Sequence, residues 1–164
     1  MIEVRELTIE YGEVIDTINI VNIRVKGPAI AARIFRKKIG RATQEVFCIL
    51  MLNARHVPIG YVEVSRGTMT QSLVHPREVF RPAIQAGAVA LILGHCHPSQ
   101  NPEPSRHDYG ITRRLVKAGH LVGIPIVDHV IVCDLDRYFS MKEDGTYPNL
   151  FELNNEEEKE NEEQ

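Results

Sequence analysis

The sequence predicts one α/β (α+β) domain, in which helices flank a mixed β-sheet. Strand-like and helix-like segments alternate along the chain, as they do in layered α/β folds. The chain has 164 residues, which is enough to bury a core within a single domain. Its apolar content of 43% and its charged content of 25% are ordinary for a globular protein.

Three helices are expected, each with a recognisable start and stop. Proline suits the first helical turn, serine caps it, and glycine often follows the last residue. Apolar residues three and four positions apart mark the face toward the core. The expected helices cover residues 28–39 (Ile30, Ala31, Ile34 and Phe35 inward, Gly40 at the end), 76–86 (Val79, Phe80, Ala83 and Ile84 inward, then Gly87), and 105–118 (Ile111, Leu115 and Val116 inward, then Gly119).

Short apolar or alternating runs predict the strands. One or two strands are expected within residues 1–25, where no motif is recognisable. The other expected strands cover residues 45–52 and 57–64 (joined as a hairpin), 88–93 (a buried run that leads to two histidines), 124–132 (interrupted by Asp128 and His129), and 138–141 (followed by a turn at Gly145).

The charge distribution sets an acidic C-terminus apart from the rest of the chain. Seven Glu and one Lys from Glu152 onward carry −6, so the total of −3 leaves +3 for residues 1–151. We expect an acidic, disordered tail at 143–164. The charge of +3 on residues 1–151 is not by itself evidence of nucleic-acid binding.

The sequence favours a cytoplasmic protein that does not enter a membrane. Its cysteines, Cys48, Cys96 and Cys133, are odd in number and widely spaced, which argues against a disulfide framework and for a reducing compartment. There is no apolar run of about 18 residues, as a membrane span requires. The first residues lack the basic and apolar pattern of a signal peptide.

His95, His97 and Asp108 are the candidate metal ligands. Residues two apart on an extended chain point to the same side, so both imidazoles face one place. Asp108 follows at the expected start of a helix. Two nitrogens and one carboxylate oxygen suit zinc, and three protein ligands leave the fourth position open, as in catalytic sites.

Ser105 and Asp108 also have the spacing of a capping box, in which both side chains satisfy free backbone N–H groups. Capping and metal binding are compatible, because one carboxylate oxygen can cap while the other faces a metal. A motif match alone leaves both interpretations open.

Hydrolysis at a zinc site also needs a general base, because zinc lowers the pKa of water toward about 7 but does not carry the proton away. Glu45, at the start of the first sheet strand, is the best candidate. From the pattern alone, a carboxylate at a strand edge facing solvent is the more common alternative.

A basic cluster lies on the first expected helix. It is a possible phosphate-binding patch, but it lacks interleaved aromatic residues, so a solvated helix face is favoured. The cluster consists of Arg33, Arg36, Lys37, Lys38 and Arg41.

Several separate blocks closely resemble the RadC family, which belongs to the JAB/MPN metalloenzymes with the JAMM signature. The blocks are Gly67-Thr68, 74–80, 92–99, 104–108, 112–115 and 123–132, and the resemblance covers residues 25–142. The bounds of an N-terminal extension, 1–24, and of the domain, 25–142, follow from this resemblance. It implies an MPN/JAB-like domain of cytidine-deaminase-like architecture. It also implies zinc ligation by His95, His97 and Asp108, a general base at Glu45 and oxyanion stabilisation by Ser105.

The resemblance implies hydrolysis of peptide or isopeptide bonds in a peptide or protein substrate, including ubiquitin-like linkages. Two alternatives are a DNA-repair-associated or mobile-element accessory protein and a non-catalytic MPN scaffold. Fuller family members carry an N-terminal helix-hairpin-helix module associated with DNA. We expect this sequence to be a short form without it, which weakens the DNA-related alternative.

Two positions depart from the family pattern. Cys96 stands where relatives usually have Asn, and Gln100 where they usually have Gly. We expect Cys96 to point away from the metal as a packing thiol, and Gln100 to stiffen or narrow the loop over the site. Asp128 and His129 match the family; they are either a carboxylate that orients a ligand histidine or a satisfied pair at a strand kink.

Overall fold

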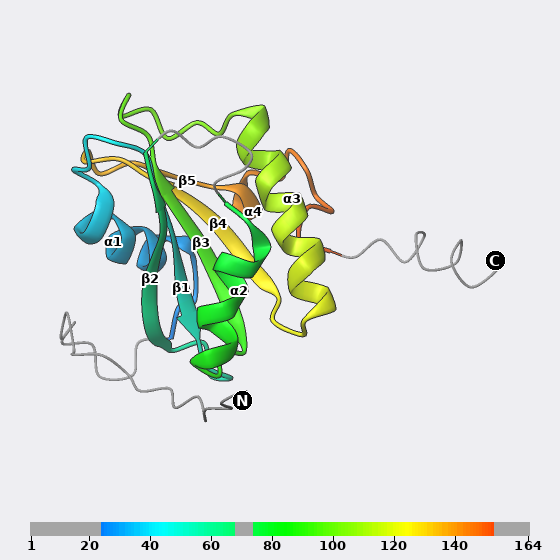
Figure 1. The fold of residues 1–164 in the computed structure, drawn as a ribbon. Helices are drawn as coiled ribbons and strands as arrows, with labels where there is room; N and C mark the ends of the chain where they lie inside the picture. The colour runs from blue at the N-terminus through cyan, green and yellow to red at the C-terminus, as the bar shows by residue number, and fades with distance from the viewer. Residues whose placement is uncertain (1–23, 68–73, 153–164) are drawn as a thin grey trace, which may run out of the picture.

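The computed structural model describes residues 24–67 and 74–152 (Figure 1). The strands expected near the N-terminus and the acidic residues from 154 onward lie outside the described residues. None of the helices in the described part of the chain combines the length and the apolar content that crossing a membrane requires.

A five-stranded mixed sheet forms the centre of the fold, as the sequence predicts. Its strand order is β2-β1-β3-β4-β5. The β1–β2 pair is the expected antiparallel hairpin, β1 and β3 are also antiparallel, and β3 and β4 are parallel. The strands are β1 Val46–Leu52, β2 Pro58–Arg66, β3 Ala90–Cys96, β4 Ile126–Val132 and β5 Tyr138–Ser140.

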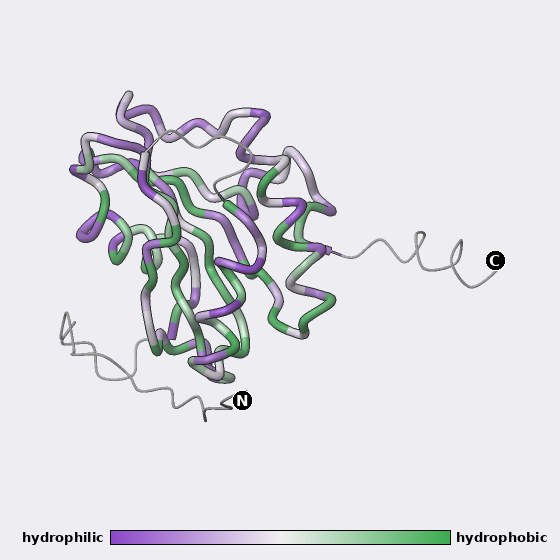
Figure 2. The backbone as a smooth tube through the Cα atoms, viewed as in Figure 1, coloured by the Kyte–Doolittle hydropathy of each residue, from purple (hydrophilic) through white to green (hydrophobic). Residues whose placement is uncertain are grey.

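Helices cover both faces of the sheet (Figure 1). Helix α1 (Pro28–Ile39) packs on one face, while α2 (Pro76–Gln85) and α3 (Arg106–Leu121) pack on the other. The side chains of β1 alternate between the two cores: Phe47 and Ile49 face α2 and α3, whereas Cys48 and Leu50 face α1. The central strands are the most hydrophobic part of the backbone (Figure 2). A sheet covered on both faces explains why β1 and β3 are continuous apolar runs.

The helix starts agree with the sequence prediction. Pro28 lies in the first turn of α1, and Pro76 lies in the first turn of α2. His75 caps α2, because its Nδ1 accepts a hydrogen bond from the Arg77 N–H at 3.2 Å. Ser105 is the N-cap of α3.

The end of α3 differs from the prediction. The helix runs through Gly119 to Leu121 and is followed by Gly123 in the left-handed region, with φ +72°. Gly119 is buried inside the helix, where an added Cβ would lie 2.7 Å from the carbonyl oxygen of Ile124. This glycine therefore permits a close approach of the following loop and does not end the helix.

Two apolar residues predicted to face the core are exposed. Ile84 is 58% exposed: it lies about 40° around α2 from Phe80, just beyond the edge of the buried face that Val79, Phe80 and Ala83 form. Val89 is 47% exposed and precedes β3.

The chain after β4 packs more closely than the sequence predicts. Residues Asp128 and His129 do not interrupt β4 but lie within it, and both are buried. A short helix, α4 (Met141–Asp144), follows β5 and was not expected. Leu150, within the predicted tail, is buried in a small cluster with Ile131 and Met141.

Candidate metal centre

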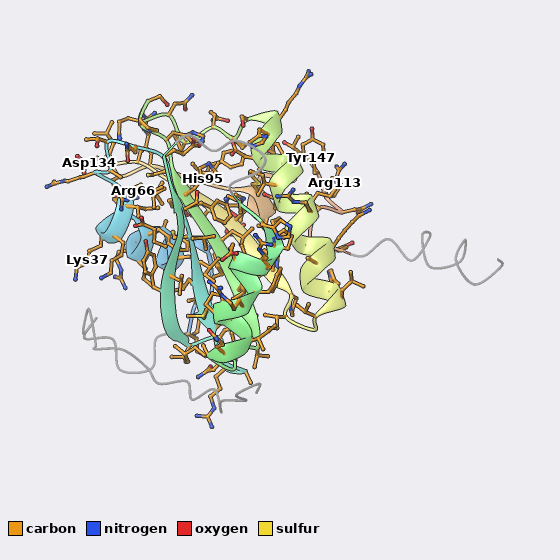
Figure 3. All side chains as sticks on the ribbon, viewed as in Figure 1. Lys37, Arg66, His95, Arg113, Asp134 and Tyr147 are labelled. Carbon is orange, nitrogen blue, oxygen red and sulfur yellow. The ribbon has the colours of Figure 1, made fainter. Side chains whose placement is uncertain are left out.

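Three separate segments bring Glu45, His95, His97 and Asp108 together at one end of the sheet. Because β1 and β3 are antiparallel, with Val46 paired to Cys96, the start of β1 lies beside the end of β3. The first turn of α3 supplies the carboxylate of Asp108. One ligand atom from each of the four residues lies within 4.8 Å of the others. Figure 3 shows His95 within the sheet, between α1 and α3.

The two imidazoles face one another, as the spacing predicts. The Nε2 atoms of His95 and His97 are 2.8 Å apart. His95 is fully buried, and its ring stacks on that of Phe47 at a centroid distance of 6.3 Å. Cys96, between them in sequence, packs in the core beneath α1, so its thiol points away from the cluster as expected.

Asp108 caps α3 and also faces the histidine pair. Its Oδ2 accepts hydrogen bonds from the backbone N–H of Ser105 at 2.7 Å and from the Ser105 hydroxyl at 2.6 Å, completing the capping box. Its Oδ1 lies 3.4 Å from Nε2 of His95. Burial raises the pKa of this carboxyl, but the hydrogen bonds with His97 and with Ser105 outweigh burial and hold the pKa well below its ordinary value.

Glu45 stands further out than the other three residues. Its Oε1 is 3.9 Å from Nε2 of His97, and its side chain is 23% exposed, compared with 3% for Asp108. A carboxylate in this position is within reach of solvent and of the cluster at the same time.

The donor set of the cluster fits a cation. A carbonyl oxygen only accepts hydrogen bonds, so Asn101 O, 2.8 Å from Nδ1 of His97, requires a proton on that Nδ1. In the neutral ring, Nε2 of His97 is then a bare lone pair. It faces Nε2 of His95 and the two carboxylates, a set of donor atoms that either a metal ion or a second proton on His97 brings together; the contact with Asp108 accordingly raises the pKa of His97. Nitrogen and oxygen donors without a thiolate suit zinc among several divalent metals.

The roles of two residues behind His95 were not predicted from the sequence: His129 contacts His95, and Thr112 contacts His129. Nε2 of His129 lies 2.7 Å from Nδ1 of His95, and Nδ1 of His129 lies 2.6 Å from the hydroxyl of Thr112. Burial lowers the pKa of His129 to about 4, which keeps the ring neutral near pH 7. The available signals were a histidine inside an apolar strand and the four-residue spacing of Thr112 from Asp108 on one helix face.

Asp128 does not orient a ligand histidine, contrary to one of the two interpretations of the sequence. Its Oδ2 accepts from the Ser140 hydroxyl at 2.7 Å, and its Oδ1 accepts from the Lys142 N–H at 3.2 Å. The carboxylate therefore ties β4 to the start of α4. The contact with His95 comes from the neighbouring side chain, His129, on the opposite side of the strand.

The side chain of Gln100 joins the loop after His97 to the turn between β4 and β5 by a hydrogen bond. Its φ of +59° lies in the left-handed region, which glycine adopts most easily. Its Oε1 accepts a hydrogen bond from the Asp134 N–H at 2.6 Å. The glutamine thus holds a backbone conformation suited to glycine and adds a side-chain tie that glycine lacks.

The basic cluster of α1 is partly neutralised by acidic residues of the β4–β5 turn. Arg36 pairs with Asp136, and Arg41 pairs with Asp134 at 2.9 Å. Lys37 and Arg113 lie on opposite outer sides of the molecule (Figure 3).

Comparison with known proteins identifies the family. Residues 25–146 match the family model described as "RadC-like JAB domain". The chain is 41% identical over 136 residues to a "UPF0758 protein" of Alkaliphilus oremlandii (strain OhILAs), covering 82% of this chain and 58% of that protein. It is 45% identical over 121 residues to one of Rubrobacter xylanophilus, covering 74% of this chain and 52% of the relative.

A third such protein, from Symbiobacterium thermophilum, is 52% identical over 101 residues, covering 62% of this chain and 43% of the relative. The chain therefore spans about half the length of the curated relatives it matches. The family model covers well over half of the chain. The chain belongs to the RadC-like JAB domain family.

Proposed function

We propose that this domain is a JAMM-type zinc metallohydrolase that cleaves peptide or isopeptide bonds in a peptide or protein substrate. The observation that carries this proposal is the convergence of two imidazoles and two carboxylates at the start of β1, the end of β3 and the first turn of α3. The family supports the same assignment, since the match to the RadC-like JAB domain covers all four of these residues.

His95, His97 and Asp108 would hold the metal. Their two Nε2 atoms and Oδ1 of Asp108 provide three ligands, which leave a tetrahedral position open. When bound, a zinc ion supplies a Lewis acid that polarises a carbonyl group and lowers the pKa of an attacking water. Asn101 O supports this arrangement, because its contact with Nδ1 keeps the ring of His97 in the ligating tautomer.

Glu45 would be the general base. Its carboxylate would take a proton from the attacking water and deliver it to the leaving amine. The 3.9 Å separation from His97 and the partial exposure of Glu45 support this role, because a proton carrier must reach water and substrate. The buried Asp108 lacks that access.

Ser105 would donate a hydrogen bond to the oxyanion of the tetrahedral intermediate. In the structure its hydroxyl proton is directed to Oδ2 of Asp108 at 2.6 Å. Oxyanion donation therefore requires the hydroxyl to turn away from Asp108, whose Oδ2 would keep the backbone N–H of Ser105 as a partner.

We further propose a reducing, cytoplasmic setting, supported by three free and buried thiols at Cys48, Cys96 and Cys133. Burial raises the pKa of Cys48 and of Cys96, which favours the inert protonated thiol.

The pairing of Arg36 and Arg41 with aspartates gives no support to duplex DNA as the main partner.

The test compares three variants of the full chain by zinc titration and by cleavage of a fluorescence-quenched peptide library. His97→Ala removes a ligand and is expected to abolish zinc binding. Glu45→Gln is expected to bind zinc like the unmodified chain and to lose cleavage. His56→Asn, an exposed histidine in the β1–β2 turn at the opposite end of the sheet, is the matched control and should change neither.

Failure of the unmodified chain to bind zinc in this titration would rule out the proposal. Zinc binding with cleavage that is equal in the Glu45→Gln variant and the unmodified chain would remove the role of Glu45. Zinc binding without cleavage of any peptide would favour the non-catalytic scaffold.

A further inference from the structure

His129 is a fully buried imidazole directly behind the proposed ligand His95. Its Nε2 lies 2.7 Å from Nδ1 of His95, the nitrogen that faces away from the cluster. The rings of Phe47 and His129 form a T-shaped pair with a centroid distance of 5.5 Å. The proposed hydrolysis uses neither His129 nor Thr112, its neighbour on α3, although both are fully buried polar side chains.

The direction of these hydrogen bonds can be worked out from the backbone carbonyl of Asp108, which only accepts. The Thr112 hydroxyl oxygen lies 2.7 Å from that carbonyl oxygen. Two oxygens this close attract only if the hydroxyl proton lies between them. Thr112 has a single hydroxyl proton. Apart from His129, the only other acceptor beside it among the described residues is the weakly accepting sulfur of Met141 at 3.4 Å.

Once its proton is directed to Asp108, the Thr112 hydroxyl can only accept from His129. Nδ1 of His129, 2.6 Å away, must therefore carry a proton. In a neutral imidazole the other nitrogen is then bare, so Nε2 of His129 accepts. Nδ1 of His95 must carry the proton between the two rings, and Nε2 of His95 is left as a lone pair facing the cluster.

We infer that Thr112 and His129 are positioning residues that hold His95 in the tautomer whose Nε2 can bind a metal. The inference rests on the proposed metal site. The hydrogen-bond chain runs from His95 on β3 through His129 on β4 and Thr112 to the backbone of Asp108 on α3. It therefore links two proposed ligands from different elements through side chains that are fully buried.

Removing the Thr112 hydroxyl is expected to weaken zinc binding without unfolding the domain. In Thr112→Val the buried Nδ1–H of His129 loses its acceptor, which favours the other tautomer of both rings and a proton on Nε2 of His95. Outer partners of metal-bound histidines typically change metal affinity by about 10- to 100-fold. We expect a loss in that range, and recovery in Thr112→Ser, which restores the hydroxyl.

The experiment measures Zn²⁺ affinity by competition with a chromophoric chelator, with thermal unfolding as a check on folding. Ser140→Ala is the matched control, because it also removes a buried hydroxyl that donates at 2.7 Å, in this case to Asp128. It should lower stability and leave zinc affinity unchanged. Two-bond ¹H–¹⁵N spectra of the metal-free protein report which nitrogen of His95 carries the proton.

A protonated Nδ1 on His95 in the unmodified chain, with weaker zinc binding in Thr112→Val only, supports the inference. A bare Nδ1 on His95, or a folded Thr112→Val variant with unchanged zinc affinity, overturns it. If the unmodified chain binds no zinc, the proposed function fails, while the proton position on His95 still decides whether the hydrogen-bond chain sets the tautomer.

Discussion

Oδ2 of Asp108 accepts two hydrogen bonds from Ser105, while Oδ1 of the same carboxylate lies 3.4 Å from Nε2 of His95. One side chain therefore starts α3 and also faces the histidine pair. Because the capping box holds Oδ2, the rotation of the carboxylate is restricted and Oδ1 stays directed at the cluster.

The first prediction concerns the contribution of Ser105 to stability. Ser105→Ala removes the hydroxyl that caps α3, and loss of an N-cap costs about 1 kcal/mol. Urea denaturation should show a free energy of unfolding lower by about that amount. Ser105→Thr keeps the hydroxyl and should lie close to the unmodified chain. An Ala variant as stable as the Thr variant would show that the cap does not stabilise α3.

The second prediction concerns Gln100, whose left-handed backbone and side-chain tie to Asp134 act in opposite directions. The left-handed conformation lowers the free energy of unfolding by about 1–2 kcal/mol for a residue with a side chain, and the hydrogen bond raises it by about 1 kcal/mol. Gln100→Ala loses the bond and keeps the strain, so it should be less stable than the unmodified chain. Gln100→Gly loses both and should unfold at a higher urea concentration than Gln100→Ala; the reverse order would contradict this account.

The third prediction compares two glycines of α3. An alanine Cβ at Gly110 would meet nothing within 4 Å, so Gly110→Ala should raise the free energy of unfolding by about 0.5–1 kcal/mol through helix propensity. At Gly119 the Cβ would lie 2.7 Å from the Ile124 carbonyl oxygen. Gly119→Ala should therefore lower stability by about 1–3 kcal/mol. Two variants with the same sign in thermal or urea unfolding would refute the close contact.

Much of the fold followed from local patterns in the sequence. Pro28, Pro76 and Ser105 mark helix starts because each acts within one turn of its own helix. The apolar runs of β1 and β3 predicted buried strands. Errors arose at Ile84, which lies beside the buried face of α2, and at Gly119, where a packing contact resembles a stop signal.

The site was predictable only as far as its residues lie close in sequence or match a family pattern. His95 and His97 share a strand end, and Asp108 stands at a helix start, so their spacing indicated a metal site. The sequence evidence for Glu45 was weaker, because it is the pairing of β1 with β3 that places Glu45 beside the histidines. His129 lies beside His95 through the parallel pairing of β3 and β4, which no local spacing indicates.

The sequence by itself determined the mixed sheet, the helix starts and the candidate ligand set, because these depend on side-chain periodicity, capping and donor chemistry within short segments. The tertiary structure decided that Oδ2 of Asp108 caps α3 and lies near His97 while Oδ1 faces His95. It also decided that His129 and not Asp128 contacts His95, and that Gln100 ties its loop to Asp134. These relationships depend on distances between β1, β3, β4 and α3, and packing alone sets such distances.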